Sequence, residues 1–276
     1  MKQIKISILV ENTVYSSPFK AEHGWSVLIE TPDWSVLWDT GQSSLFLENA
    51  QIMDIDLRKI NKVVLSHGHY DHTGGLPALL SLYPQIPVHA HPDVFKKRYY
   101  VTSKKCSREI GIPKELIKHT DKFCLSKEPQ ELFPGCITTG EIPRLYSIED
   151  NLTSFYNDPE GMELDLLLDD QTLILNTSEG LAVILGCCHA GLANTFEHIS
   201  ELTGEHHFNL VMGGMHLSGA SDKVIRETLD VLRKFHIKKI GAAHCTGHRG
   251  AIALEQAFPG MIFPCSVGTT LKLTLP

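Results

Sequence analysis

Residues 67 to 72, with the sequence His-Gly-His-Tyr-Asp-His, place four side chains that can bind metal ions within six positions. His67 and His69 are two residues apart and point to the same side of an extended chain, whereas Asp71 and His72 follow on a turn. Imidazole and carboxylate groups are ligands suited to zinc, iron or manganese. The spacing separates one pair of ligands from the other, so this loop can contribute to two adjacent ions. An exposed polar turn is the disfavoured alternative.

Three more histidines each follow an apolar run: His189 in GCCHAG, His216 in VMGGMHL and His244 in AAHCTG. A lone histidine at the end of a strand is usually a polar turn residue, so these gain weight only from the loop at 67 to 72. His216 stands beside two glycines that allow close backbone approach. It is a candidate proton donor, substrate contact or additional ligand.

Alternating and continuous apolar runs predict the elements that must carry these residues. We expect strands at 2–10, 25–31 and 35–41, a buried strand at 62–67, a helix over 74–84 that ends at Pro84, and a strand at 87–91. Residues 93–101 and 113–120 have helical character. In the second half we expect two strands within 163–175 around a turn at Asp169 and Asp170, strands at 181–187, 208–214, 237–243 and 269–275, and helices at 194–204 and 221–235. Ser221 is the expected N-cap of the last helix.

Two segments, 63–80 and 182–199, repeat one order: apolar strand, histidine-bearing loop, Gly-Leu or a near equivalent, then helix. Two half-domains of this kind can pack sheet against sheet with helices outside, so we predict a four-layer αββα sandwich of mixed α/β class. Both histidine loops would lie at the carboxyl ends of strands, where open α/β sheets usually bind ligands. We expect a single domain over residues 1–276, with a substrate-site insertion at about 92–160.

Composition narrows the classes of function. The 276 residues are 42% hydrophobic and carry a formal net charge of -7, which disfavours extended contact with nucleic acid. The seven cysteines are an odd number without a C-x-x-C pair, which is typical of a reducing cytoplasm rather than of a disulfide framework. The N-terminus lacks a signal-like apolar region and no run is long enough for a membrane helix. We therefore expect a cytoplasmic protein without a membrane association.

The segment Phe-Lys-Lys-Arg-Tyr-Tyr at 95–100 supplies candidate contacts for a small anionic substrate: Lys97, Arg98 and Tyr99. Cations beside aromatic rings suit an anionic ligand that bears a ring, although a solvated helix face explains the same residues. Backbone amides around Ser266 could also meet a phosphate, and an ordinary turn explains them equally well.

The motif H-x-H-x-D-H followed by Thr-Gly-Gly-Leu resembles the metal-binding motif of the metallo-β-lactamase superfamily, and the resemblance covers nearly the whole chain. It implies the αββα fold with one or two divalent ions between the sheets, most simply zinc, with iron or manganese as alternatives. It also implies that Asp39 in LWDTG buttresses the metal loop. The ligand sets that it implies are His67, His69 and His189 around one ion, and Asp71, His72 and His244 around the other.

This sequence departs from the superfamily's pattern at one place. Many members have an aspartate that bridges two ions at a late strand end, where this chain has Cys188 and His189. Asp169 and Asp170 could replace it, but we interpret them as a hairpin turn. The number of ions therefore stays open.

Within the superfamily, the motifs look most like a subgroup related to an archaeal dihydropterin-aminobenzene ribofuranosyl phosphate synthase. The first functional hypothesis is a hydrolase that uses metal-activated water on a phosphoester, ester or lactone, in which Asp71 orients the water or receives its proton. The alternatives are a synthase in which the metals stabilise departing phosphates, and a metal-binding sensor without catalysis. The sequence predicts no oligomeric state.

Overall fold

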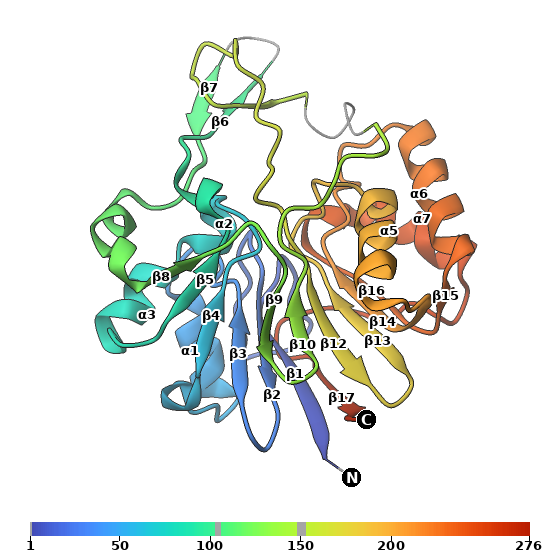
Figure 1. Ribbon diagram of the computed structural model, residues 1–276, viewed down its shortest axis with the longest axis horizontal. Coiled ribbons are helices and arrows are strands. Elements are labelled where there is room, and N and C mark those ends of the chain that lie inside the picture. The colour runs from blue at the N-terminus through green and yellow to red at the C-terminus, as the bar shows by residue number, and fades with distance from the viewer. Residues whose placement is uncertain (1, 103–105, 148–152) are drawn as a thin grey trace.

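The computed structural model describes residues 2–102, 106–147 and 153–276. Two seven-stranded sheets form its body, and a smaller three-stranded sheet projects from one end (Figure 1).

The first sheet has the strand order β17-β1-β2-β3-β4-β5-β8. β1, β2 and β3 form an antiparallel meander, whereas β3, β4, β5 and β8 run parallel to one another. The carboxyl ends of the parallel strands therefore meet at one edge of the sheet. The bounds are β1 (Gln3–Val10), β2 (Ser26–Glu30), β3 (Ser35–Trp38), β4 (Lys62–Val64), β5 (Val88–Ala90), β8 (Phe123–Leu125) and β17 (Thr270–Thr274).

The second sheet has the order β15-β14-β13-β12-β10-β9, and β16 also pairs with β14. β13, β14, β15 and β16 are parallel, so their carboxyl ends again share one edge. The bounds are β9 (Gln130–Phe133), β10 (Cys136–Thr138), β12 (Leu173–Thr177), β13 (Gly180–Ile184), β14 (His207–Gly213), β15 (His236–Ile237) and β16 (Ile240–Ala242).

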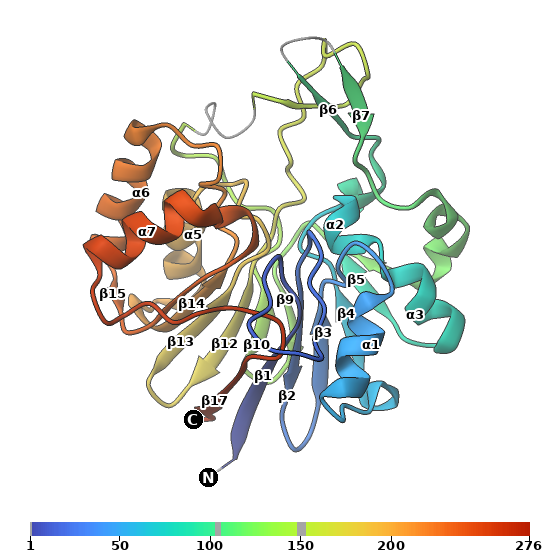
Figure 2. The ribbon, with the colours of Figure 1, turned by 180° about the vertical axis from the view of Figure 1, so that it is seen from behind.

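The inner faces of both sheets share one apolar core, which includes Val27 and Trp38 from the first sheet and Ile184 and Met212 from the second. On the outer faces, α1 (Leu45–Ile52) and α3 (Leu76–Leu82) cover the first sheet, and α5 (Leu192–Thr203), α6 (Asp222–Lys234) and α7 (Gly247–Ala257) cover the second (Figures 1 and 2). This arrangement confirms the predicted four-layer αββα sandwich. Short helical turns lie between these elements: η1 (Leu57–Lys59), α2 (Tyr70–Thr73), η2 (Pro92–Phe95), η3 (Lys114–Lys122) and η4 (His244–Thr246).

Helix α6 forms as its sequence predicts. The Ser221 side chain accepts a hydrogen bond from the amide of Val224, and Ile225, Leu229 and Leu232 are buried on one face. The final strand is also confirmed: β17 pairs with β1 at the edge of the first sheet, which brings the two chain ends side by side (Figure 2).

The predicted insertion at 92–160 is only partly separate from the main sheets. β8, β9 and β10 fall within this range but belong to the two large sheets. The projecting sheet consists of β6 (Tyr99–Val101), β7 (Ser107–Glu109) and β11 (Phe155–Tyr156), in the order β11-β6-β7.

Two local predictions are wrong. The helical expectation for 93–101 holds only for η2, since the chain is extended again from Tyr99. The expected hairpin around Asp169 and Asp170 does not form: β12 begins at Leu173 and pairs with β13 across the turn at Ser178 and Glu179. Across the described residues, no helix combines the length and the apolar character needed to cross a bilayer.

Candidate metal centre

The six predicted ligands come from the carboxyl ends of strands in both sheets. His67 lies just after β4, His69 immediately precedes α2, and Asp71 and His72 lie within α2. From the second sheet, His189 follows β13 and His244 follows β16. Because the parallel strands of each sheet end on the same side, the structure brings these residues together between the two sheets.

His67, His69 and His189 form one group, whose ligand atoms all lie within 4.8 Å of one another. Nε2 of His67 is 3.0 Å from Nδ1 of His69. The ring of His189 lies 4.9 Å from that of His67 and 5.0 Å from that of His69, measured between centroids. All three side chains are buried. This is the set predicted for the first ion.

The set predicted for the second ion also converges. Nε2 of His72 lies 3.2 Å from Nε2 of His244, and Oδ2 of Asp71 lies 3.3 Å from Nε2 of His244. Oδ2 of Asp71 is 4.0 Å from Nε2 of His72. His23, which sequence reasoning missed, places its Nε2 3.0 Å from the same carboxylate oxygen of Asp71.

Asp39 supports this centre through contacts with Ser66 and His72. Its carboxylate accepts hydrogen bonds of 2.7 Å from the backbone amide of Ser66 and 2.7 Å from the Ser66 hydroxyl, and its Oδ2 lies 2.7 Å from Nδ1 of His72. With the Nδ1 proton of His72 donated to Asp39, Nε2 is left facing the ligand group. These contacts match the buttressing role that the resemblance implies for Asp39.

His244 has its own support from β1 and the residues after it. Nδ1 of His244 lies 3.0 Å from Oδ1 of Asn12, and its backbone amide donates to Oε1 of Glu11 at 2.7 Å. Sequence reasoning missed both residues. The available signal was a carboxylate and an amide directly after the apolar end of β1.

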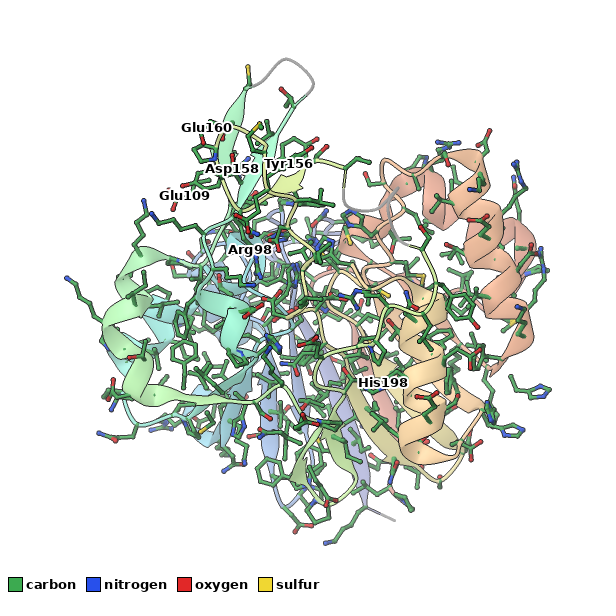
Figure 3. The ribbon with its side chains drawn as sticks, turned by 45° about the horizontal axis from the view of Figure 1, so that its top comes forward. Arg98, Glu109, Tyr156, Asp158, Glu160 and His198 are labelled. Atoms are coloured by element: carbon green, nitrogen blue, oxygen red, sulfur yellow. The ribbon has the colours of Figure 1, made fainter. Side chains whose placement is uncertain are left out.

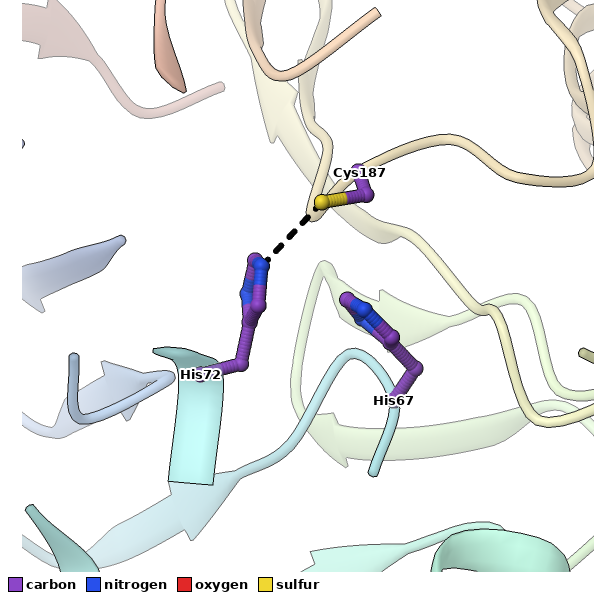
Figure 4. A group of neighbouring side chains, drawn as sticks. All are labelled: His67, His72 and Cys187. Atoms are coloured by element: carbon purple, nitrogen blue, oxygen red, sulfur yellow. Dashed lines mark hydrogen bonds between the residues drawn. The ribbon is translucent and has the colours of Figure 1, made fainter. Parts of the chain in front are cut away.

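A thiol stands between the two groups. Sγ of Cys187 lies 3.1 Å from Nε2 of His72, with His67 close by (Figure 4). Cys187 also forms potential ligand groups with His189 and His216. Sequence analysis assigned no role to Cys187. Its neighbour Cys188 belongs to the core under α5, with its Sγ 3.5 Å from the hydroxyl of Thr195.

His216 lies at the edge of the centre. Its ring centroid is 4.5 Å from that of His189, and its backbone has a left-handed φ of 51°. Such a conformation is costly for a residue with a side chain and is retained where surrounding structure requires it. Asp39 and His244 have left-handed φ values too, of 57° and 50°. Three of the functional candidates therefore occupy strained positions.

The electrostatics separate the histidines into two kinds. Burial, with neighbouring histidines or Arg98 adding to it, lowers the pKa of His67, His69 and His189 well below the ordinary value. These imidazoles are therefore neutral, the form that binds metal. Burial also lowers the pKa of His72, but the carboxylates of Asp39 and Asp71 outweigh it and raise that pKa to about 9. The two carboxylates thus favour positive charge beside His72.

Several buried nitrogens have no hydrogen-bond partner within the described parts of the chain: Nε2 of His69, both ring nitrogens of His189 and Nδ1 of His216. Leaving buried polar atoms unpaired costs about 1–3 kcal/mol each. A divalent ion satisfies such atoms, so the donor set fits a metal ion and fits an empty polar cavity poorly.

The substrate contacts predicted from 95–100 are distributed differently. Arg98 is buried at the base of the projecting sheet (Figure 3), where Nε donates to Asp165 at 2.8 Å and the two terminal nitrogens donate to Asp169 at 2.8 and 2.6 Å. The prediction that Arg98 contacts substrate is therefore corrected, because its guanidinium is engaged inside the protein. Lys97 is exposed and Tyr99 is half-buried in β6. The Ser266 side chain contacts Thr269 within its own turn.

Asp169 and Asp170 lie at a turn, as predicted, but it joins no hairpin, and both are buried supports of the centre. Oδ2 of Asp169 accepts from the backbone amide of Gly68 at 2.8 Å, so the Arg98–Asp169 pair holds the metal loop between its first two histidines. Oδ2 of Asp170 accepts from the backbone amide of Ala190 at 2.8 Å, next to His189.

Comparison with known proteins agrees with this architecture. The family model described as the metallo-beta-lactamase superfamily matches residues 20–148. A 7,8-dihydropterin-6-methyl-4-(β-D-ribofuranosyl)-aminobenzene-5'-phosphate synthase of Methanocaldococcus jannaschii is 33% identical over 270 residues, which cover 92% of each chain. The chain belongs to the metallo-β-lactamase superfamily.

Two further relatives show how widely the similarity extends within this superfamily. An uncharacterised protein of the same archaeon is 35% identical over 263 residues, covering 91% of this chain and 94% of that protein. The crystal structure of a metal-dependent hydrolase of the β-lactamase superfamily superimposes with a TM-score of 0.82 at 30% identity, covering 97% of this chain and 98% of the other. Proteins named as a synthase and as a hydrolase are thus about equally similar to this chain.

Proposed function

We propose that this protein is a metal-dependent hydrolase that directs water at a phosphoester, ester or lactone bond of a small anionic molecule, with one or two divalent ions, most simply zinc. The observation that carries the proposal is the convergence of two ligand groups whose buried imidazole nitrogens lack partners. The seven free cysteines support the accompanying expectation of a cytoplasmic location.

A divalent ion would supply Lewis acidity toward water and toward a substrate oxygen. The protein's own side chains orient the water and transfer the protons. Asp71, whose Oδ2 is held by His23 and His244, orients the attacking water and receives its proton. Burial raises the pKa of Asp71, but His72, His23 and His244 outweigh it and hold that pKa well below the ordinary value. The carboxylate is therefore ionised at neutral pH, the form that can bind a cation and hold water through its oxygens.

His216 is proposed as the proton donor to the departing group. It lies next to His189 and outside the two predicted ligand sets, and its Nδ1 has no partner within the described residues. Burial lowers its pKa, and contact with Cys245 and nearby carboxylates outweighs this and raises it. A protonated imidazole at this place suits the general acid of a cleavage reaction.

A synthase is the second candidate function, and the 33% identity to the archaeal enzyme over nearly the whole chain favours it. In that reading, a pterin is joined to an aminobenzene riboside, and bound ions would supply positive charge toward the departing phosphates. Both candidates share the breaking of a bond to an anionic group, so the same ligands serve either. A non-catalytic sensor, the third class, requires a filled coordination sphere without a position open to solvent.

The decisive experiment combines metal analysis with turnover. Protein purified without chelator is expected to contain one or two equivalents of divalent metal. It is then assayed against phosphoesters, lactones and the pterin diphosphate, the last with and without the aminobenzene riboside phosphate. Release of the pterin alcohol in both cases supports the hydrolase; release of a condensed product only with the second substrate supports the synthase.

Two variants test the assigned residues. His69→Ala is expected to lose metal and turnover while remaining folded, whereas the control His207→Ala, at an exposed surface histidine, keeps both. Unchanged metal content in His69→Ala would count against the ligand set. His216→Ala is expected to keep its metal and lose turnover, and loss of metal instead would make His216 a ligand.

A further inference from the structure

Phe155, in β11, packs directly on the centre. Its ring centroid lies 5.3 Å from the ring of His69, 5.1 Å from that of His189 and 5.6 Å from that of His216. Each of these three histidines carries an unpartnered buried nitrogen. The phenyl ring therefore forms an apolar wall against these three histidines.

The wall is held in place by the projecting sheet. Phe155 pairs with Tyr100 of β6, and its carbonyl accepts from the amide of Asp165 at 2.9 Å. The carboxylate of Asp165 accepts from Arg98, which also binds Asp169. Through this chain of buried contacts, the position of Phe155 is fixed relative to the metal loop.

The surface beside this wall is aromatic and cationic. The Tyr100 ring lies 6.0 Å from that of Phe155 and is 41% exposed, so the apolar surface continues outward. Across the β6–β7 pair, Arg108 is opposite Tyr100, and its guanidinium lies 4.6 Å above the ring of Tyr70. A ligand that rests on Phe155 thus has a second aromatic face beside it, with the cationic Arg108 on the far side of Tyr100.

We infer that Phe155 determines substrate specificity: it selects molecules in which the anionic reacting group is attached to a planar aromatic ring. This inference rests on the proposed function, since it assigns a substrate class to the same site. A group that reaches the centre past His69 and His189 must lie against the phenyl ring. Offset or edge-to-face contact with that ring favours an aromatic neighbour over an aliphatic one.

The test uses metal-loaded protein and two phosphonates that cannot be hydrolysed, phenylphosphonate and methylphosphonate. Calorimetry is expected to show about tenfold tighter binding of phenylphosphonate to the wild type, in line with a desolvated aromatic contact. Phe155→Ala should reduce this preference to about twofold or less without changing metal content, and Phe155→Tyr should keep it. The preference itself is the readout, because a merely structural role of Phe155 would weaken both phosphonates alike.

Tyr156→Ala is the matched control. Tyr156 is the next residue of β11 and points to the opposite face, where its hydroxyl bonds to the carbonyl of Thr153. It is expected to keep the full preference. The inference would be overturned if the wild type bound both phosphonates equally or bound neither. It would also be overturned if Phe155→Ala kept the preference for phenylphosphonate. Hydrolysis of methyl phosphate, measured separately, tests the proposed function alone.

Discussion

Sγ of Cys187 lies 3.1 Å from Nε2 of His72, which places a thiol between the two ligand groups (Figure 4). A thiolate there would bind a soft or borderline cation directly. We therefore expect cobalt-substituted protein to show a sulfur-to-cobalt charge-transfer band in the near ultraviolet. Cys187→Ser should abolish this band and weaken metal binding, because a hydroxyl is a poorer ligand.

The neighbouring cysteine supplies the control. Cys188→Ala removes a thiol from the core under α5 and leaves the centre's donors intact, so the band should persist. If Cys187→Ser kept the band and Cys188→Ala lost it, the assignment of the facing thiol would be wrong.

Asp39→Asn tests the support beneath His72. Asparagine can still accept from the amide of Ser66, but its amide group opposes the Nδ1 proton of His72 and disturbs the tautomer that presents Nε2. Loss of such outer contacts typically weakens metal binding by about 10- to 100-fold. Competition with a chromogenic chelator measures this, with Asp33→Asn at the exposed β2–β3 turn as control. Equal affinities in both variants would contradict the buttressing role.

The sequence predicted best those features that depend on residues close together along the chain. The four predicted ligands at 67 to 72 lie within six consecutive positions, and the apolar run before them forms the buried strand β4. Helix α6 follows from its N-cap and its apolar periodicity, both of which act within four residues.

Sequence patterns could not resolve features that depend on distant partners. Cys187 and Cys188 are adjacent and chemically identical, but Cys188 has a left-handed φ of 58° and packs in the core under α5, whereas Cys187 faces His72. The same holds for Arg98. Its local sequence predicts an exposed cation, but in the fold it binds Asp165 and Asp169, which lie about seventy positions further along the chain. Phe155 gave no signal either, because a single aromatic residue in an irregular segment has no period.

Gly68, between the first two histidines, has no room for a side chain. A Cβ placed there would lie 2.4 Å from the carbonyl oxygen of Val94 and 2.5 Å from a terminal nitrogen of Arg98. Gly68→Ala should therefore displace the metal loop, destabilise the fold by about 1–3 kcal/mol and lower metal content. Gly219→Ala, where no atom lies within 4 Å, is the control. Denaturant titration with metal analysis checks both variants. Unchanged stability and metal content in Gly68→Ala would mean that the metal loop can shift to accommodate a methyl group.

Arg98→Ala separates a structural role from a substrate contact. The change leaves the buried carboxylates of Asp165 and Asp169 without their cation, which typically costs about 3–5 kcal/mol. The free energy of unfolding should fall by this order, whereas the exposed Lys97→Ala should change it by about 0.5 kcal/mol or less. A raised KM in Arg98→Ala with unaltered stability would restore the substrate role that the sequence suggested.

Asp170 makes stability depend on pH. Burial, opposed in part by Arg144, raises the pKa of its fully buried carboxyl from 3.8 to about 6. The folded protein therefore holds this proton more tightly than the unfolded chain does. The resulting stabilisation is complete below about pH 3.8 and is lost as the pH rises through about 6, a change on the order of 3 kcal/mol.

Asp170→Asn removes the charge but keeps an oxygen that can accept from the amide of Ala190. In metal-free protein, the variant should be more stable than the wild type at pH 8 by up to about 3 kcal/mol, and the two should converge near pH 4. Urea titrations at a series of pH values measure the difference. A difference that does not vary with pH would mean that Asp170 is already ionised when the protein folds, with its charge balanced by Arg144 or by another neighbouring cation.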